Sequence, residues 1–182
     1  MKIEISAGTI LISKPFMEDK RFDKTIILLT QHDEEGTIGL IINRLCLFNP
    51  KDIIPELNSF NIKIKEGGPV EKDKLFFIHK HPNIIKDSKK IKNELYFGGD
   101  FDKLINGINQ KQILVDDVLF FIGYAGWDKY QLNDEIQDGS WILYEINDLN
   151  KIFKQIDWSS TLVEINQEYK VWANAPTDFH LN

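Results

Sequence analysis

The chain has 182 residues, a length that fits one domain with a substantial buried core. Hydrophobic residues make up 42% and charged residues 27%, which is typical of a globular protein, and no apolar run approaches the roughly 18 residues of a membrane helix. The net charge of −6 argues against nucleic-acid binding, because an acidic chain gains little from neutralising phosphates.

Two further features indicate where the protein resides. Cys46 is the only cysteine and cannot form an internal disulfide, which agrees with a reducing compartment. The first fourteen residues, MKIEISAGTILISK, carry Glu4 and no cleavage-site pattern, so no signal peptide is predicted. We therefore expect a cytoplasmic protein that is not bound to a membrane.

The first half of the chain predicts a hairpin and a short helix. After the apolar run 10–13, residues 25–30 and 37–43 are rich in β-branched side chains and flank the polar stretch HDEEG, which is typical of two paired strands. Asn49 followed by proline predicts the start of a helix, and Pro55 predicts its end or a kink.

The middle of the chain predicts two strands and a capped helix. Residues 75–79 (LFFIH) form one strand, which is entered through Gly67-Gly68-Pro69, and residues 95–97 form the other. Gly98-Gly99-Asp100 then predicts a tight turn that leads into a helix. This turn resembles a phosphate-binding loop, but it lacks the lysine and spacing of a P-loop, and the structural interpretation is favoured.

The last third begins with an almost continuous apolar strand at 117–122, which predicts that both of its faces are covered. The stretch GYAGW at 123–127 then predicts a strand-to-helix corner. Asp128 and Gln131 have the spacing of a capping box, so a helix is expected over 129–138 with Gly139 as its left-handed C-terminal residue. A strand at 141–146, a helix at 148–155 and an irregular tail from about residue 170 complete the expected single domain of residues 1–182.

No metal site or cofactor site is predicted. His79 and His81 are two residues apart on a predicted strand and would share a face, but no third ligand lies nearby. Asp33, Glu34 and Glu35 are adjacent at a turn tip, where their side chains point apart, so a solvated turn is favoured. No Ser-His-Asp arrangement is recognisable, and Cys46 has no activating neighbour.

The two arginines stand out against the lysines. Of 22 basic residues only Arg21 and Arg44 are arginine. The planar guanidinium binds two acceptors at once where lysine offers a point charge, so arginine persists where geometry matters. Arg44 is expected either to bind an internal carboxylate or loop carbonyls, which is favoured, or to anchor an anionic ligand.

Three motifs in series resemble the YqgE/AlgH family of bacterial proteins. They are GTILISKPFMEDKRFDKTIILLTQHDEEGTIGLIINR, GGPVEKDKLFFIH and GYAGWDKYQLNDEIQDGSWIL, which together span about residues 8–146. The resemblance implies an α/β fold, bordering on α+β, in which helices flank a mixed, bifurcated sheet that forms a pseudo-barrel. The candidate binding residues that it implies are Asn43, Arg44, Gly67, Gly68, Pro69, Gly123, Tyr124, Gly126, Trp127, Gln131, Leu132 and Glu135.

The resemblance implies no established activity, although some members are labelled transcriptional regulators. The first hypothesis is a non-catalytic regulatory or binding module that acts through an unknown protein or small-molecule partner. The second is direct DNA binding, against which the charge argues. The third is an enzyme or binder that acts on a small anionic metabolite, for which Arg44, a helix N-terminus and a carboxylate such as Glu135 would have to converge. Relatives commonly carry glycine where Tyr130 stands, which makes a flexible ligand loop less plausible here.

Overall fold

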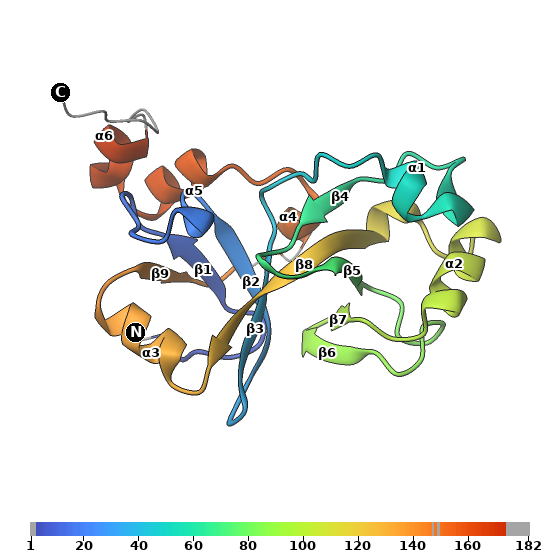
Figure 1. The fold of residues 1–182 in the computed structure, drawn as a ribbon, viewed down its shortest axis with the longest axis horizontal. Coiled ribbons are helices and arrows are strands. Elements are labelled where there is room, and N and C mark those ends of the chain that lie inside the picture. Colours follow the sequence, from blue (N-terminus) through green and yellow to red (C-terminus); the bar gives the residue numbers. More distant parts are fainter. Residues whose placement is uncertain (1–2, 147, 149, 174–182) are drawn as a thin grey trace.

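The computed structural model describes residues 3–146, 148 and 150–173, and within this part a nine-stranded sheet forms the centre (Figure 1). The strands are β1 (Ile10–Ser13), β2 (Ile26–Asp33), β3 (Gly36–Ile41), β4 (Ile64–Glu66), β5 (Val70–His79), β6 (Lys89–Lys92), β7 (Leu95–Phe97), β8 (Val118–Asp128) and β9 (Trp141–Tyr144). The helices are α1 (Pro50–Ile53), α2 (Phe101–Asn109), α3 (Gln131–Gln137), α4 (Asn150–Phe153), α5 (Trp158–Ile165) and α6 (Lys170–Ala173).

The sheet is mixed and branched. Its order is β6-β7-β5-β8-β3-β2-β1-β9, and β4 pairs with β8 outside this path. One edge of β8 is shared, because β4 runs parallel to residues 120–122 and β3 runs antiparallel to residues 125–128. The expected mixed, bifurcated α/β sheet is therefore confirmed. The pseudo-barrel is not closed, since β6 and β9 lie at opposite ends of the order and no pairing joins them in the described part.

The branch requires the chain to cross β8 between β4 and β5. β4 lies on one edge of β8, whereas β5 pairs with the other edge from Leu75↔Ile122 to His79↔Val118. The crossing segment packs its backbone directly on β8: a Cβ on Gly67 would lie 2.1 Å from the Gly123 carbonyl oxygen, and one on Gly68 would lie 2.1 Å from the Tyr124 carbonyl carbon. These two positions therefore exclude any side chain.

Hydrogen bonds hold the crossing on both sides. The Gly67 N–H donates to the Ile122 carbonyl of β8 at 2.8 Å, and the Gly67 carbonyl accepts from the Ile41 N–H at the end of β3, also at 2.8 Å. Gly123 completes the arrangement with a φ of +68°, in the left-handed region that favours glycine. The motif glycines thus join the two branches of the sheet.

Helices cover both faces of β1 and β2, the strands that lie beyond β3 in the sheet order. On one face, Trp158 and Leu162 of α5 pack with alternate residues of β1, among them Ile10 and Ile12. On the other face, Leu132 of α3 packs in a second cluster with Leu11, Ile27, Trp127 and Trp141. A third cluster lies at the far end of the molecule, where α2 packs against β5 and β8 (Figure 1). β1 and β2 are therefore buried on both faces.

Elements that depend on neighbouring residues, such as a hairpin and helix caps, are found where the sequence predicts them. The hairpin is confirmed as β2 and β3. Asn49 and Asp100 are the N-caps of α1 and α2, and their side chains accept hydrogen bonds from the N–H groups of Lys51 and Lys103. The helix predicted around 148–155 is shorter, at Asn150–Phe153. Part of the expected irregular tail, Lys170–Ala173, forms α6, and residues 174–182 lie outside the described residues.

The predicted corner at 123–127 is wrong. β8 continues through this stretch to Asp128, because β3 pairs with residues 125–128 and keeps the backbone extended. The chain turns only at Lys129 and Tyr130, and α3 starts at Gln131. The N-cap is Tyr130, with a left-handed φ of 67° and no capping bond from its side chain. Asp128 contributes its backbone N–H, which donates to Gln131 Oε1 at 3.0 Å.

Lys65 occupies the fork between the two branches of the sheet. It lies on β4 and is buried, and its ammonium group donates to the carbonyl of Ile42, just beyond the end of β3. This bond satisfies a carbonyl oxygen at the point where the strands separate. Burial of the charge lowers the pKa of Lys65 from 10.5 to about 8.

This pKa predicts a stability that rises with pH. Between about pH 8 and 10.5 the unfolded chain binds more protons at Lys65 than the folded chain, so the free energy of unfolding increases with pH in this window. Urea unfolding of the wild type and of Lys65→Met should diverge there, with a slope in the difference of up to about 1.4 kcal/mol per pH unit. Tyrosine titration cancels in the difference. A difference that is flat across this window would contradict the assignment.

Candidate functional site

One carboxylate organises the region around the end of β8. Glu135 on α3 accepts hydrogen bonds at Oε2 from the indole N–H groups of Trp127, at 2.9 Å, and Trp141, at 2.8 Å. Its other oxygen, Oε1, accepts from the amide of Gln131 at 3.0 Å. Hydrogen bonds to an ionised acceptor are stronger than neutral ones. Glu135 therefore joins the strands on either side of α3 to the helix itself.

The sequence produces this arrangement by helical spacing. Gln131 and Glu135 are four residues apart and share one face of α3, while Leu132 turns into the core. Trp127 lies on β8, which precedes α3 in the chain, and Trp141 lies on β9, which follows it. Phe22 adds a third ring, stacked on Trp127 with centroids 6.1 Å apart and edge-on to Trp141 at 5.7 Å. The result is an aromatic cluster around a carboxylate that accepts three hydrogen bonds.

Asn43 and Arg44 position the loop that carries Phe22. The Asn43 side chain accepts from the Ile26 N–H at 2.8 Å and donates to the Lys24 carbonyl at 2.9 Å. The Arg44 guanidinium donates through Nη1 to the Arg21 carbonyl and through Nη2 to the Asp23 carbonyl, each at 3.0 Å. This geometry agrees with the favoured expectation for Arg44, which was that it binds an internal carboxylate or loop carbonyls. Its guanidinium binds loop carbonyls, with the Glu66 carboxylate 4.0 Å away.

Arg21 has a different environment. Its side chain is 66% exposed and forms a close pair with Asp19, with 2.7 Å between Nη2 and Oδ2. Exposed ion pairs of this kind contribute little to stability. The guanidinium of Arg44 therefore ties two points of a loop together, whereas that of Arg21 forms an exposed pair with a neighbouring side chain.

Arg44→Lys should therefore lower stability, because one ammonium cannot span two carbonyls. We expect a loss of about 1 kcal/mol for the missing hydrogen bond, measured by urea unfolding. Arg21→Lys is the matched control and should change stability by less than about 0.5 kcal/mol. Equal effects of the two substitutions would show that the loop carbonyls do not need a planar donor.

The surface beside this cluster is hollowed by two adjoining pockets. The first, of about 310 Å³, is lined by Pro69, Gly126, Trp127, Gln131 and Glu135 together with the loop around Phe22. The second, of about 390 Å³, is lined by Tyr124, Gly126, Trp127 and the tip of the β2–β3 hairpin. Val70, Gly126 and Trp127 belong to both. We call these two pockets together the motif groove.

The structure divides the predicted site residues into two groups. Six of them line the motif groove: Pro69, Tyr124, Gly126, Trp127, Gln131 and Glu135. The others form the scaffold, with Gly67, Gly68 and Gly123 at the crossing, Asn43 and Arg44 on the loop, and Leu132 in the core.

Sequence reasoning missed several lining residues. Phe22, Val70 and Asp138 line the groove and were not predicted to do so. Phe22 lies next to Arg21 in the first motif, but nothing local connects that motif to Trp127. Only the fold brings the three motifs to one face.

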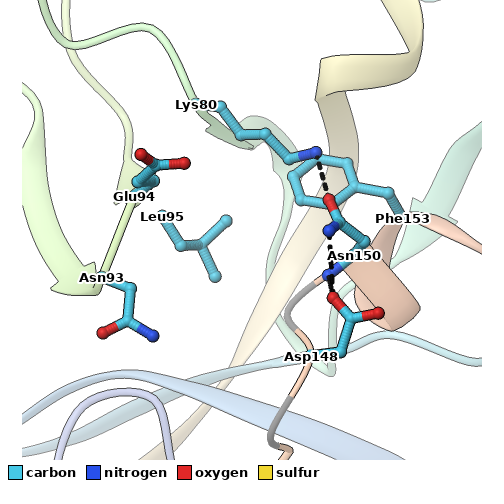
Figure 2. Close-up of a pocket in the computed structure, with 7 residues that line it drawn as sticks. All are labelled: Lys80, Asn93, Glu94, Leu95, Asp148, Asn150 and Phe153. Atoms are coloured by element: carbon cyan, nitrogen blue, oxygen red, sulfur yellow. Dashed lines mark hydrogen bonds between the residues drawn. The ribbon is translucent and has the colours of Figure 1, made fainter.

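A larger pocket, of about 460 Å³, lies away from all motif residues, between the β6–β7 turn and α4 (Figure 2). Lys80 forms part of one wall, where its ammonium donates to Asn150 Oδ1 at 2.8 Å and lies 4.3 Å from the centroid of the Phe153 ring. Asn150 in turn donates to Asp148 at 3.0 Å. The polar groups of this wall therefore satisfy one another.

The two histidines do not form a metal pair. His79 is buried, its Nε2 lies 3.0 Å from the Gly98 carbonyl, and its Nδ1 accepts the His81 N–H. Burial lowers the pKa of His79 to about 4 and keeps the ring neutral at physiological pH. His81 binds Asp117 instead, with 3.0 Å between Nε2 and Oδ2. In the described part of the chain, no group of three or more His, Cys, Asp and Glu side chains could hold a metal ion.

No described helix is long and apolar enough to cross a membrane. The fold is thus an open, branched α/β sheet with a groove beside α3. The family model described as AlgH-like (DUF179) matches residues 10–173, and the chain belongs to this family.

Relatives share almost the full length of the chain. A UPF0301 protein of Cytophaga hutchinsonii is 35% identical, covering 98% of this chain and 100% of its own, and one of Parabacteroides distasonis is 37% identical, covering 96% and 90%. Among solved structures, AlgH of Pseudomonas aeruginosa superposes with a TM-score of 0.72 at 25% identity, covering 98% and 100%. Protein DIP2367 of Corynebacterium diphtheriae superposes with a TM-score of 0.76 at 19% identity, covering 96% and 95%. The names of these relatives specify no reaction.

Proposed function

We propose that the protein is a non-catalytic binding module that acts through a partner held in the motif groove. The observation that carries this proposal is the state of Glu135, the central ionisable group of the groove. Both of its oxygens accept hydrogen bonds, from two indoles and one amide. The three bonds occupy most of the roughly four acceptor positions of a carboxylate and fix Glu135 within the groove wall, whereas a general base needs a lone pair directed at its substrate.

We propose further that any regulatory role is indirect and runs through a protein. The groove lies on a chain of net charge −6 and is lined by carboxylates, which repel the phosphates of DNA. A small anionic ligand is disfavoured as well, because the carboxylates of the groove repel it and the Arg44 guanidinium is directed at loop carbonyls. We infer as well that one domain carries this function, because β8 belongs to both branches of the sheet.

Photo-crosslinking in native cells tests the proposal. A benzophenone amino acid replaces Val70, which is exposed and lines both halves of the groove, and in a control strain it replaces Leu114, which is exposed on the loop after α2. We expect discrete, protease-sensitive products from position 70 that are missing from position 114. The same products from both positions, or products sensitive only to nuclease, would contradict the proposal.

A further inference from the structure

Residues 44–46 add a short antiparallel strand to β4, on the side that faces away from β8. Leu45 pairs with Lys65 in an isolated bridge, and backbone hydrogen bonds of 3.0 and 2.9 Å join Arg44 and Cys46 to β4. Figure 1 shows the segment between β3 and α1 running along β4. This segment is therefore the outermost strand of the β4 branch.

The backbone of Leu45 is directed outward. The Arg44 carbonyl and the Cys46 N–H are both bonded to β4. Because successive residues of a strand direct these groups to opposite sides, the N–H and the carbonyl of Leu45 face away from β4. No backbone hydrogen bond joins either group to another residue in the part of the chain that the structure describes. Leu45 thus carries an open donor and an open acceptor.

Apolar side chains lie beside these open groups. Leu45 is 56% exposed, and Leu47 and Phe48, which follow it, are 100% and 66% exposed. Exposed apolar residues that stand singly are normal, but three in one short stretch indicate an interaction surface. We call residues 44–48 the Leu45 edge.

The Leu45 edge lacks the charges that usually protect a strand edge from pairing. β6, at one end of the sheet order, has such protection, with three lysines in four residues. At the Leu45 edge, by contrast, the Arg44 guanidinium is bonded to loop carbonyls and lies 4.0 Å from the Glu66 carboxylate. The Lys65 ammonium is bonded to the Ile42 carbonyl. These charges are engaged within the chain and do not oppose a second strand.

We propose that the Leu45 edge is an interface between two copies of this chain, related by a two-fold axis at Leu45. Residues directly opposite each other in an antiparallel pair can exchange both backbone bonds, so each Leu45 N–H donates to the Leu45 carbonyl of the partner copy. Arg44 then lies opposite Cys46 of the partner copy, and no like charges face each other. Leu45, Leu47 and Phe48 of the two copies cover one another.

A second copy is the occupant because the edge is complementary to itself in backbone bonding, in apolar side chains and in charge, as a two-fold contact requires. The motif groove includes none of residues 44–48. The contact is therefore independent of the proposed function, and either can fail without the other.

Sedimentation equilibrium of the full chain tests the contact. The area buried lies below the roughly 1,200 Å² of stable interfaces, so we expect a dissociation constant on the order of 100 µM. Leu45→Ser with Leu47→Ser should weaken the dimer at least about tenfold. The matched control, Leu114→Ser with Val171→Ser, changes two exposed apolar residues elsewhere and should weaken it less than about twofold.

Leu45→Pro separates backbone pairing from apolar attraction. Proline removes an N–H that has no backbone partner within the described chain but donates across the two-fold axis in the dimer. The melting curve should therefore stay close to that of the wild type, while the dimer weakens at least about tenfold. The serine pair and its control remain decisive if Leu45→Pro fails to fold.

Three results would overturn the proposal. One is a wild-type chain that sediments as a monomer at about 1 mM, well above the expected dissociation constant. Another is an equal loss in the serine pair and its control, and the third is an unchanged dimer affinity in a folded Leu45→Pro chain. A benzophenone amino acid in place of Leu47 should crosslink two copies of this chain in cells. Capture of a different protein instead, with a monomeric wild type, would make that protein the occupant.

Discussion

The close contact between the Gly67–Gly68 backbone and β8 is the constraint on which the other features of the structure depend. It lets the chain pass from one edge of β8 to the other, so that β4 and β5 both pair with the same strand. β8 can then continue into a second branch with β3, and its end reaches α3. Without this crossing the two halves of the molecule would share no strand, and the three motifs would not meet.

The motif residues serve two purposes that the sequence does not separate. One group forms a chain of support: Arg44 holds a loop, the loop places Phe22, and Phe22 packs on Trp127, which Glu135 binds. The other group lines a groove around Gly126. The stretch GYAGW contains both, with Gly123 in the scaffold and Gly126 in the lining of the groove. A motif of this kind reflects the fold and a binding surface together.

Local chemistry made part of the fold predictable from the sequence. The helix caps at Asn49 and Asp100 depend on neighbouring residues, and they were predicted correctly. The corner at 123–127 was not, because Gly123 resembles a turn residue until the crossing segment, more than fifty residues earlier in the chain, is placed on it. The need for a guanidinium at Arg44 was foreseeable, but its carbonyl partners, about twenty residues away, were not. Sequence patterns report local geometry well and long-range backbone contacts poorly.

Alanine substitution at two motif glycines tests the role of the crossing most directly. A Cβ at position 67 would lie 2.1 Å from a backbone oxygen, whereas one at position 126 would meet only side-chain atoms. Urea unfolding should therefore show a loss of about 3 kcal/mol or more for Gly67→Ala. Gly126→Ala should change stability by less than about 1 kcal/mol, since only the Tyr124 ring, 3.1 Å from the added Cβ, has to shift and alanine is favoured over glycine within a strand. A Gly67→Ala chain as stable as the wild type would show that the backbones do not touch, and the account of the branched sheet would be wrong.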